Sequence, residues 1–248
     1  GIAPGPQGAG AAGAGLPTVI WPFAKPLPPL DAASSARRDA LTREKADLSQ
    51  PLADLRWCVV DTETGGLDAQ RDPLLSIGAV AIEHGRIALE TSLEVGLTQT
   101  QSTADANILI HGISDSEQRA GNPPHTALLD WLEFAGAAPR VAFHAAFDQT
   151  VLQRAEREHL GVSTVAPWFD AAVVAPLLFP DAAPQCRQLD DWLTHFGIAV
   201  YARHGALADA YATAELWLVL LDAAQRNHIT TAHQLRKLLQ ARRWLSAH

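Results

Sequence analysis

The sequence predicts an α/β fold in which helices flank a mixed sheet. Three observations predict it: apolar runs typical of strands gather between residues 56 and 96, helical periodicity dominates after residue 124, and one short strand over residues 141–144 leads into a helix. Early strands joined by short turns pair antiparallel, whereas strands that alternate with helices pair parallel. We therefore expect three early antiparallel strands, followed by parallel strands.

Length and composition limit the class of protein. The chain has 248 residues, enough for one large domain with an appendage. With 48% apolar and 19% charged residues it has a globular balance, and no apolar run approaches the roughly 18 residues of a membrane span. A net charge of −8 argues against attachment to nucleic acid or anionic membranes through overall charge, although it leaves room for a local nucleic-acid site. Without a membrane-spanning run we expect a soluble protein with no membrane contact, and because Cys58 and Cys186 provide no disulfide framework we expect it in the cytoplasm.

Residues 1–50 are predicted to be an extension or linker, and residues 51–248 the main domain. The first 30 residues are rich in Gly and Pro and cannot fill a core, and residues 31–49 are predicted to form a helix capped by Asp31 or Ser34. The chain opens on Gly1 rather than Met, so we expect it to have been trimmed at this end.

The main domain opens with three predicted strands. Residues 56–62 contain the run Trp-Cys-Val-Val, typical of a buried strand, and residues 74–84 and 87–96 follow as an antiparallel pair that turns at His84 and Gly85. Helices are predicted over residues 105–119, 124–137, 147–159, 170–178, 188–196, 206–225 and 231–245.

Acidic residues follow two of the predicted strands. Asp61 and Glu63 end the first strand, and because side chains two apart on a strand share a face, both carboxylates project together. Asp148 follows the strand over residues 141–144 and opens the next helix, where an acid is also a common helix cap. Ligands of open α/β sheets gather beyond the carboxyl ends of strands, which is where all three acids are expected.

A histidine and a further acid lie later in the chain. Inside one helix, His204 and Asp209 would lie roughly 140° apart and would be unable to share a site. We therefore expect the helix to begin after His204, at the flexible Gly205, so that both side chains face one cleft.

The order of Asp61, Glu63, Asp148, His204 and Asp209 resembles the DEDDh family of 3′–5′ exonucleases, which includes the proofreading epsilon subunit of bacterial DNA polymerase III. This resemblance implies an RNase H-like fold. The matching stretches cover residues 59–67, 111–113, 145–148, 169–170 and 204–210, and the resemblance as a whole runs from about residue 55 to residue 221.

The resemblance also implies a site with two divalent cations, Mg²⁺ or Mn²⁺, for which oxygen ligands are suited. It implies that Asp61 bridges both cations, that Glu63 and Asp209 complete the shell of the tightly held one, and that Asp148 supports the second, partly through water. His204 would be the general base for the attacking water. Crowded carboxylates repel one another strongly without metal, so the acids and the cations imply one another.

Substrate contacts are implied in the same way. The main chain of a short Gly-containing segment would receive the terminal 3′-hydroxyl, two apolar side chains would pack on the terminal base, and a histidine would lie near the substrate strand. In this order the residues are Thr64, Gly65 and Gly66; Leu67 and Phe147; and His111. Each of them also has an ordinary structural reading, as a turn, a core residue or a surface histidine.

Some stretches depart from the family or have other readings. Phe143 and His144 stand where the proofreading subunit has His-Asn, and Asp170 is predicted to cap the helix that follows it. Residues 188–193 have an amphipathic helical pattern and are expected to be core. Residues 223–248 carry five bases and no acid, and they form either a basic helix that guides phosphates or an amphipathic helix docked on the domain.

The leading hypothesis is a metal-dependent 3′–5′ exonuclease that hydrolyses phosphodiester bonds at the 3′ ends of single-stranded or frayed DNA and releases nucleoside 5′-monophosphates. One alternative is an exoribonuclease of the same fold that acts on RNA 3′ ends. Another is an accessory or scaffolding protein in DNA replication or repair. A DNA polymerase or another replication or repair protein is the expected protein partner.

Overall fold

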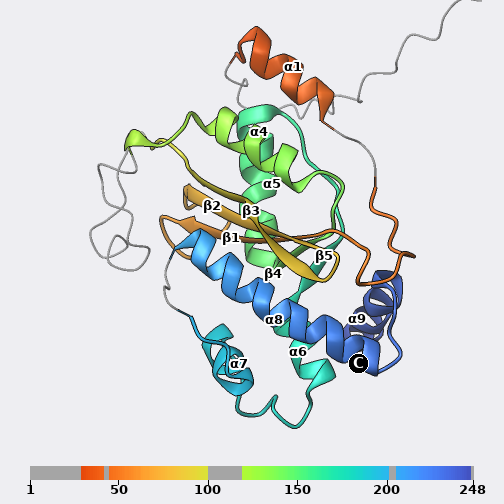
Figure 1. Cartoon of the computed structure of the whole chain (residues 1–248). Helices are drawn as coiled ribbons and strands as arrows, with labels where there is room; N and C mark the ends of the chain where they lie inside the picture. Colours follow the sequence, from red (N-terminus) through yellow and green to blue (C-terminus); the bar gives the residue numbers. More distant parts are fainter. Residues whose placement is uncertain (1–28, 42–44, 100–118, 201–204, 247–248) are drawn as a thin grey trace, which may run out of the picture.

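A five-stranded mixed sheet forms the centre of the computed structural model, which describes residues 29–41, 45–99, 119–200 and 205–246, with side chains up to residue 241 (Figure 1). The strand order is β3-β2-β1-β4-β5, with β1, β2 and β3 antiparallel and β4 and β5 parallel to β1. The predicted mixed sheet is confirmed. The strands are β1 (Trp57–Thr64), β2 (Leu74–Glu83), β3 (Arg86–Gly96), β4 (Arg140–Ala142) and β5 (Trp168–Asp170).

Seven helices accompany the sheet in the described part of the chain. They are α1 (Ala32–Ala40), α4 (Pro124–Ala135), α5 (Ala146–Leu160), α6 (Ala171–Leu178), α7 (Leu189–Phe196), α8 (Ala206–Arg226) and α9 (Ala232–Ser246). None of them is long and apolar enough to cross a lipid bilayer. The helix predicted over residues 105–119 lies outside the described residues.

The predicted helix over residues 31–49 is wrong in its length. Asp31 caps α1 as expected, because its carboxylate accepts the backbone N–H of Ser34 at 2.8 Å, but the helix ends at Ala40. Further along, the side chain of Asp47 accepts both the backbone N–H and the hydroxyl of Ser49. Such local bonds compete with helix formation and favour a turn.

The N-terminal helix α1 lies against α4. Arg37 donates to both carboxylate oxygens of Glu133, at 2.8 and 2.7 Å, and to Asp130 at 2.6 Å. These side chains are partly exposed, so each pair contributes at most about 1 kcal/mol. Leu30 and Leu41, on either side of α1, pack against the core beneath α4 and α5, which adds apolar burial to the same contact.

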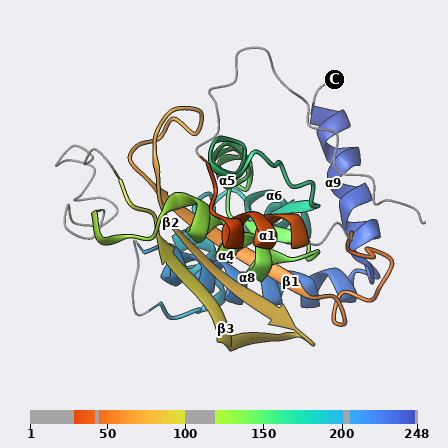
Figure 2. The ribbon, with the colours of Figure 1, turned by 90° about the horizontal axis from the view of Figure 1, so that it is seen from above.

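The sheet separates two hydrophobic layers. In β1, Trp57 and Val59 belong to the cluster that includes α6 and α8, whereas Cys58 and Val60 face the cluster formed with α4 and α5. Figures 1 and 2 show these helix pairs on opposite sides of the sheet. The alternation follows from the two-residue period of a strand, and it decides which β1 side chain points toward which helix.

The β2–β3 hairpin turns where the sequence predicts it. His84 and Gly85 have φ angles of 51° and 71°, and two consecutive positive φ values are typical of the tight type I′ turn that joins antiparallel strands. This hairpin pairs Glu83 with Arg86 at its end, and in the separate β1–β2 pairing Gly78 of β2 lies opposite Asp61 of β1. In contrast, β5 escapes prediction because three residues are too few to show a period.

Gly78 allows the first turn of α8 to lie directly on the sheet. A Cβ atom at this position would come closer than 3.0 Å to backbone atoms of both Ala206 and Leu207, which real Cβ atoms essentially never do. Glycine is therefore required here for the close approach of two backbones. Since Gly78 pairs with Asp61, this contact brings the start of α8 to the carboxyl end of β1.

We expect Gly78→Ala to lower the free energy of unfolding by about 1–3 kcal/mol, because the added methyl group must push α8 from the sheet. For a chain of this size the melting temperature would fall by roughly 2–4 °C per kcal/mol, which calorimetry measures. Gly96→Ala is the matched control, since the nearest atom to its Cβ is the Leu75 carbonyl oxygen at 3.9 Å. Equal melting temperatures for the two variants would contradict the account.

Candidate metal centre

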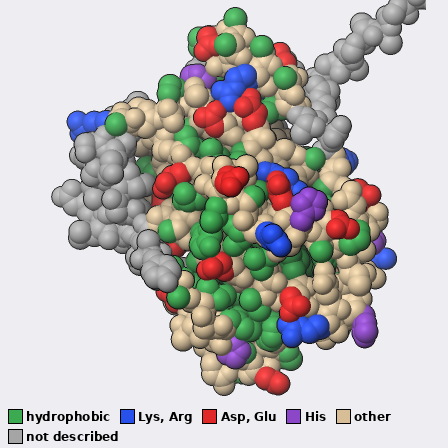
Figure 3. Space-filling view, viewed as in Figure 1, with side chains coloured by type: hydrophobic (Ala, Val, Ile, Leu, Met, Phe, Trp, Pro, Cys, Tyr) green, Lys and Arg blue, Asp and Glu red, His purple; other side chains and the backbone are tan. Residues whose placement is uncertain are grey.

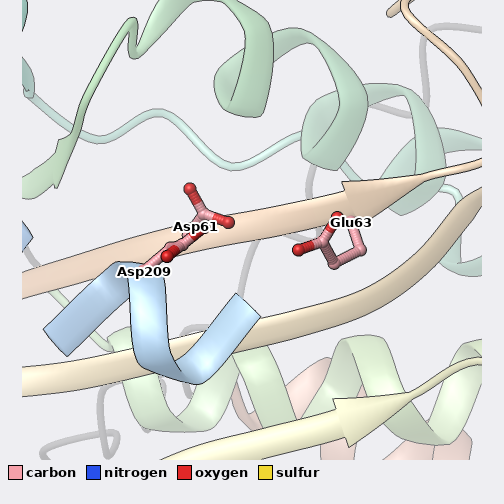
Figure 4. Close-up of side chains that lie close together, drawn as sticks. All are labelled: Asp61, Glu63 and Asp209. Carbon is pink, nitrogen blue, oxygen red and sulfur yellow. The ribbon is translucent and has the colours of Figure 1, made fainter. Parts of the chain in front are cut away.

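Three carboxylates converge at the carboxyl end of β1. Asp61 and Glu63 come from one face of the strand and Asp209 from the first turn of α8, and each offers an oxygen that lies within 4.8 Å of the others (Figure 4). All three side chains are partly buried. Within the described ranges, no other group of three or more acidic, histidine or cysteine ligands lies this close together.

The local backbone places each of these acids. The shift in register between Glu63 and Thr64 marks an irregularity at the end of β1, a feature that re-aims side chains and is common beside active sites. Helix α8 begins at Ala206 with Gly205 as its extended N-cap residue, which confirms the predicted start of the helix after His204. Asp209 therefore lies in the first turn, whose partial positive charge favours an acid.

The cluster is electrostatically unfavourable without a cation. Burial first, and then the negative charge of Asp209, together raise the pKa of Glu63 to about 7. A bound divalent cation would reverse this balance by attracting all three carboxylates. An all-oxygen donor set suits Mg²⁺ or Mn²⁺, so these residues fit the metal that the resemblance implies.

Asp148 does not belong to the three-carboxylate group. It lies in the first turn of α5, on the other face of the sheet, and its Oδ1 accepts a 2.8 Å hydrogen bond from the hydroxyl of Thr62. Asp148 is only 4% exposed, and this burial raises the pKa of its carboxyl group. Its alternative reading as a helix cap is wrong, because α5 already begins at Ala146. Thr62, between Asp61 and Glu63, is the partner that sequence reasoning missed.

The residues expected to bind substrate form a turn directly after β1. The Thr64 hydroxyl donates to the Gly66 carbonyl at 2.6 Å, and the Gly65 N–H donates to the Pro73 carbonyl at 2.9 Å. Leu67 is 95% exposed at the tip of this turn. A large apolar side chain held so openly beside the acids is available for a partner.

The other expected substrate contacts differ in their surroundings. Phe147 is partly buried and packs against the core under α4 and α5. His111 lies outside the described residues, as does the proposed general base His204.

Asp170 has two backbone partners. It caps α6 as predicted by accepting the N–H of Ala172 at 3.0 Å, and it accepts the N–H of His144 at the same distance. The second bond holds His144 in a left-handed conformation with φ of 64°. Phe143 and His144 therefore lie outside β4, which is shorter than the predicted strand over residues 141–144.

The two remaining sequence predictions concern helices away from the acids. The expected core character of residues 188–193 is confirmed by the burial of Leu189, Trp192 and Leu193 in α7. In α9, Leu235 and Leu239 are buried, so this is an amphipathic helix docked on the domain. It follows the end of α8 opposite to Asp209, and the 21 residues of α8 separate its two ends by about 30 Å.

The described residues form no broad basic surface on the face shown in Figure 3. On the face shown in Figure 3, acidic and basic side chains of the described residues are interspersed with apolar ones. A chain with a net charge of −8 therefore offers little general attraction for a polyanion. Attraction of phosphate would have to come from cations bound at the acids.

The sequence around the three carboxylates matches a known protein family. A family model described as "Exonuclease" (RNase_T) matches residues 58–217, which is more than half of the chain and includes all three clustered acids. The chain belongs to this exonuclease family. Its members are phosphodiester hydrolases, and the matched region contains the RNase H-like sheet described above.

Two relatives of this exonuclease domain have DNA polymerase III in their names. It is 32% identical over 193 residues to a DNA polymerase III subunit epsilon-like protein of Rhodobacter capsulatus, covering 76% of this chain and 27% of the relative. It is 30% identical over 188 residues to the PolC-type DNA polymerase III of Streptococcus suis, covering 74% of this chain and 12% of the relative. The chain thus spans less than a third of either relative.

Solved structures share the fold of the exonuclease domain. Escherichia coli Exonuclease I in complex with a dT13 oligonucleotide superposes with a TM-score of 0.61 at 16% identity, covering 71% of this chain and 43% of that one. Exonuclease X in complex with 5′ overhanging duplex DNA superposes with a TM-score of 0.58 at 20% identity, covering 74% of this chain and 99% of that one.

The raised pKa of Glu63 predicts how the stability of the metal-free domain depends on pH. Because its folded pKa of about 7 exceeds the ordinary value of 4.5, the folded state holds this proton more tightly than the unfolded state. The free energy of unfolding should therefore fall as pH rises from about 4.5 to about 7, by an amount on the order of 2 kcal/mol.

Glu63→Gln should remove this contribution. Urea unfolding in the presence of a chelator at pH 5 and pH 8 measures it, with Glu90→Gln on the exposed edge of β3 as the control. If the variant and the control lose the same stability between the two pH values, Glu63 is not the group responsible. Adding Mn²⁺ at pH 8 should stabilise the wild-type domain more than Glu63→Gln.

Proposed function

We propose that this domain is a divalent-metal-dependent 3′–5′ exonuclease that removes nucleoside 5′-monophosphates from single-stranded or frayed DNA 3′ ends. The observation that carries the proposal is the convergence of Asp61, Glu63 and Asp209 within 4.8 Å at the end of β1, inside the region that matches the exonuclease family. Three carboxylates this close together repel one another, and a divalent cation bound between them would offset that repulsion.

Asp61, Glu63 and Asp209 would hold the tightly bound cation, and Asp61 would also reach the second one. Two such cations supply polarisation of the scissile phosphate and a more acidic attacking water. Asp148 would support the second cation partly through water, and its hydrogen bond from Thr62 fixes the direction of its carboxylate from the other face of β1.

His204 would take the proton of the attacking water at a ring nitrogen. A neutral imidazole is suited to this task near pH 7, since its unperturbed pKa is roughly 6.5. The described start of α8 supports the role, because Gly205 is the N-cap residue and His204 thus precedes the helix that carries Asp209.

The substrate end would lie against the turn after β1. The main chain of Thr64, Gly65 and Gly66 would receive the 3′-hydroxyl, and Leu67 would pack on the terminal base. Its 95% exposure supports this role, since the contact requires an accessible apolar surface. Phe147 and His111 are the remaining proposed contacts with the substrate strand.

DNA is the proposed substrate, and a DNA polymerase or another replication or repair protein the proposed partner. The names of the epsilon-like and PolC-type relatives support both proposals, and the DNA bound to the two solved exonucleases supports the first. Residues 51–248 would be the catalytic domain and residues 1–50 its extension. The two buried cysteines, which form no disulfide, suit the cytoplasm as the site of action.

Asp61→Asn should lower the rate of DNA hydrolysis by at least about a thousandfold, because it removes the ligand shared by both cations. A 5′-labelled single-stranded oligonucleotide incubated with Mg²⁺ or Mn²⁺ reveals stepwise shortening from the 3′ end, and chromatography identifies the released mononucleotide. Glu90→Gln should retain full activity. Undiminished activity of Asp61→Asn, or of the wild-type domain in a chelator, would refute the proposal, and a matched RNA oligomer separates an exoribonuclease from a DNA exonuclease.

His204→Ala should lower kcat by about 10²–10³-fold and leave Mn²⁺ binding intact, because it removes the base without removing a ligand. The logarithm of kcat in the wild type should rise with pH on the acidic side of neutrality, and this rise should flatten in the variant. Rates measured from pH 5.5 to 9 test this point. If His204→Ala has the same pH profile as the wild type, a group other than His204 takes the proton of the attacking water.

A further inference from the structure

The turn between β1 and β2 is ordered by its own hydrogen bonds. The Asp68 N–H donates to the side chain of Asp72 at 2.7 Å, and the Asp72 N–H donates back to the Asp68 carbonyl at 2.8 Å. Gly66 packs against the same Asp72 carboxylate so closely that a Cβ would come within 3.0 Å of it. This turn therefore presents Leu67 from a compact scaffold rather than from an open loop.

Arg154 of α5 ties this turn to the body of the domain. Its Nε donates to the Ala69 carbonyl at 3.2 Å, and its Nη2 donates to the Asp72 carbonyl. Its Nη1 bonds to Glu158, one turn along the same helix, at 3.4 Å. Each guanidinium nitrogen thus has a partner, and the side chain is only 14% exposed.

The contact spans elements far apart in the sequence. The base of the turn is closed by the Gly65–Pro73 hydrogen bond, and its outer part is held to α5 by the Arg154 guanidinium, while Ala69 packs against the core beneath α4 and α5. Backbone carbonyls bonded to a guanidinium give charge-assisted bonds, which are stronger than neutral ones. Without Arg154, the turn would keep its internal bonds and its base, but its outer part around residues 67–72 would lose its attachment to α5.

We propose that Arg154 is a positioning residue for the 3′ end of the substrate: it fixes the turn over residues 65–73, and thereby Leu67, relative to the three-carboxylate cluster. This inference rests on the proposed nuclease function. Each of the three nitrogens of Arg154 already has a partner within the protein and the side chain is only 14% exposed, so we assign this residue to the position of the turn rather than to a phosphate contact. Its action is on the binding of the terminal nucleotide and not on the hydrolytic chemistry.

Arg154→Met tests this proposal by keeping the aliphatic stem and removing the donors. KM for a single-stranded oligonucleotide should rise about tenfold or more, since two charge-assisted bonds are lost. Hydrolysis of bis(p-nitrophenyl) phosphate, which has no nucleoside for Leu67 to contact, should change less than twofold. Arg157→Met, on the exposed side of the same helix, is the matched control and should behave as wild type in both assays.

A double-mutant cycle identifies the route of the effect. If Arg154 acts through Leu67, the double variant Arg154→Met with Leu67→Ala should lose little more oligonucleotide affinity than the more damaging single variant. Arg154→Lys, with one donor centre instead of a fork, should lie between wild type and Arg154→Met. Additive losses, or equal losses on both substrates, would overturn the proposal.

Hydrogen exchange gives a readout that does not depend on activity. Amides of residues 66–72 should exchange at least about tenfold faster in Arg154→Met than in wild type, while those of β1 stay protected. Unchanged exchange in this turn would overturn the inference. If the wild-type domain cleaved neither substrate, the proposed function would fail, and the exchange experiment would still decide whether Arg154 fixes the turn.

Discussion

The close contact between the first turn of α8 and β2 at Gly78 is the constraint on which the site depends. Two backbones approach there without a side chain between them, directly beside the position of Asp61 in β1. Asp209 reaches Asp61 and Glu63 only because its helix begins against the sheet. The same contact packs α8 onto the hydrophobic layer that contains Trp57 and Val59. The position of the acids and the packing of this layer therefore depend on the same residue.

The fold disfavours the charged forms of the acids at the end of β1. Burial and mutual repulsion raise the pKa of Glu63, and the buried Asp148 shows the same direction of shift. Cations would relieve this repulsion and would also give an acidic protein a local positive charge where phosphate approaches. The stability of the domain and its metal loading are therefore expected to be linked.

The sequence allowed the mixed sheet, the hairpin turn at His84 and the start of α8 after His204 to be predicted, because each depends on local patterns. The pairing of Asp61 with Glu63 followed from the strand period alone. Gly78, Thr62 and Arg154 could not be identified, since their importance arises from contacts across 80 or more positions or between separate elements. The short β5 and the early end of α1 escaped for a different reason, namely the weakness of patterns in brief segments.

Because the side chains of β1 alternate between the two faces of the sheet, an insertion or deletion in this strand would disrupt the site. Residues 61 and 63 face α8 while residue 62 faces α5, so three consecutive positions serve two opposite sides of one sheet. Inserting or deleting a single residue earlier in β1 would exchange these sides and turn both acids toward the helix that carries Asp148. We therefore expect insertions and deletions near the acids to be tolerated in the turns rather than in β1, and the turn after β1 is itself bonded to Arg154.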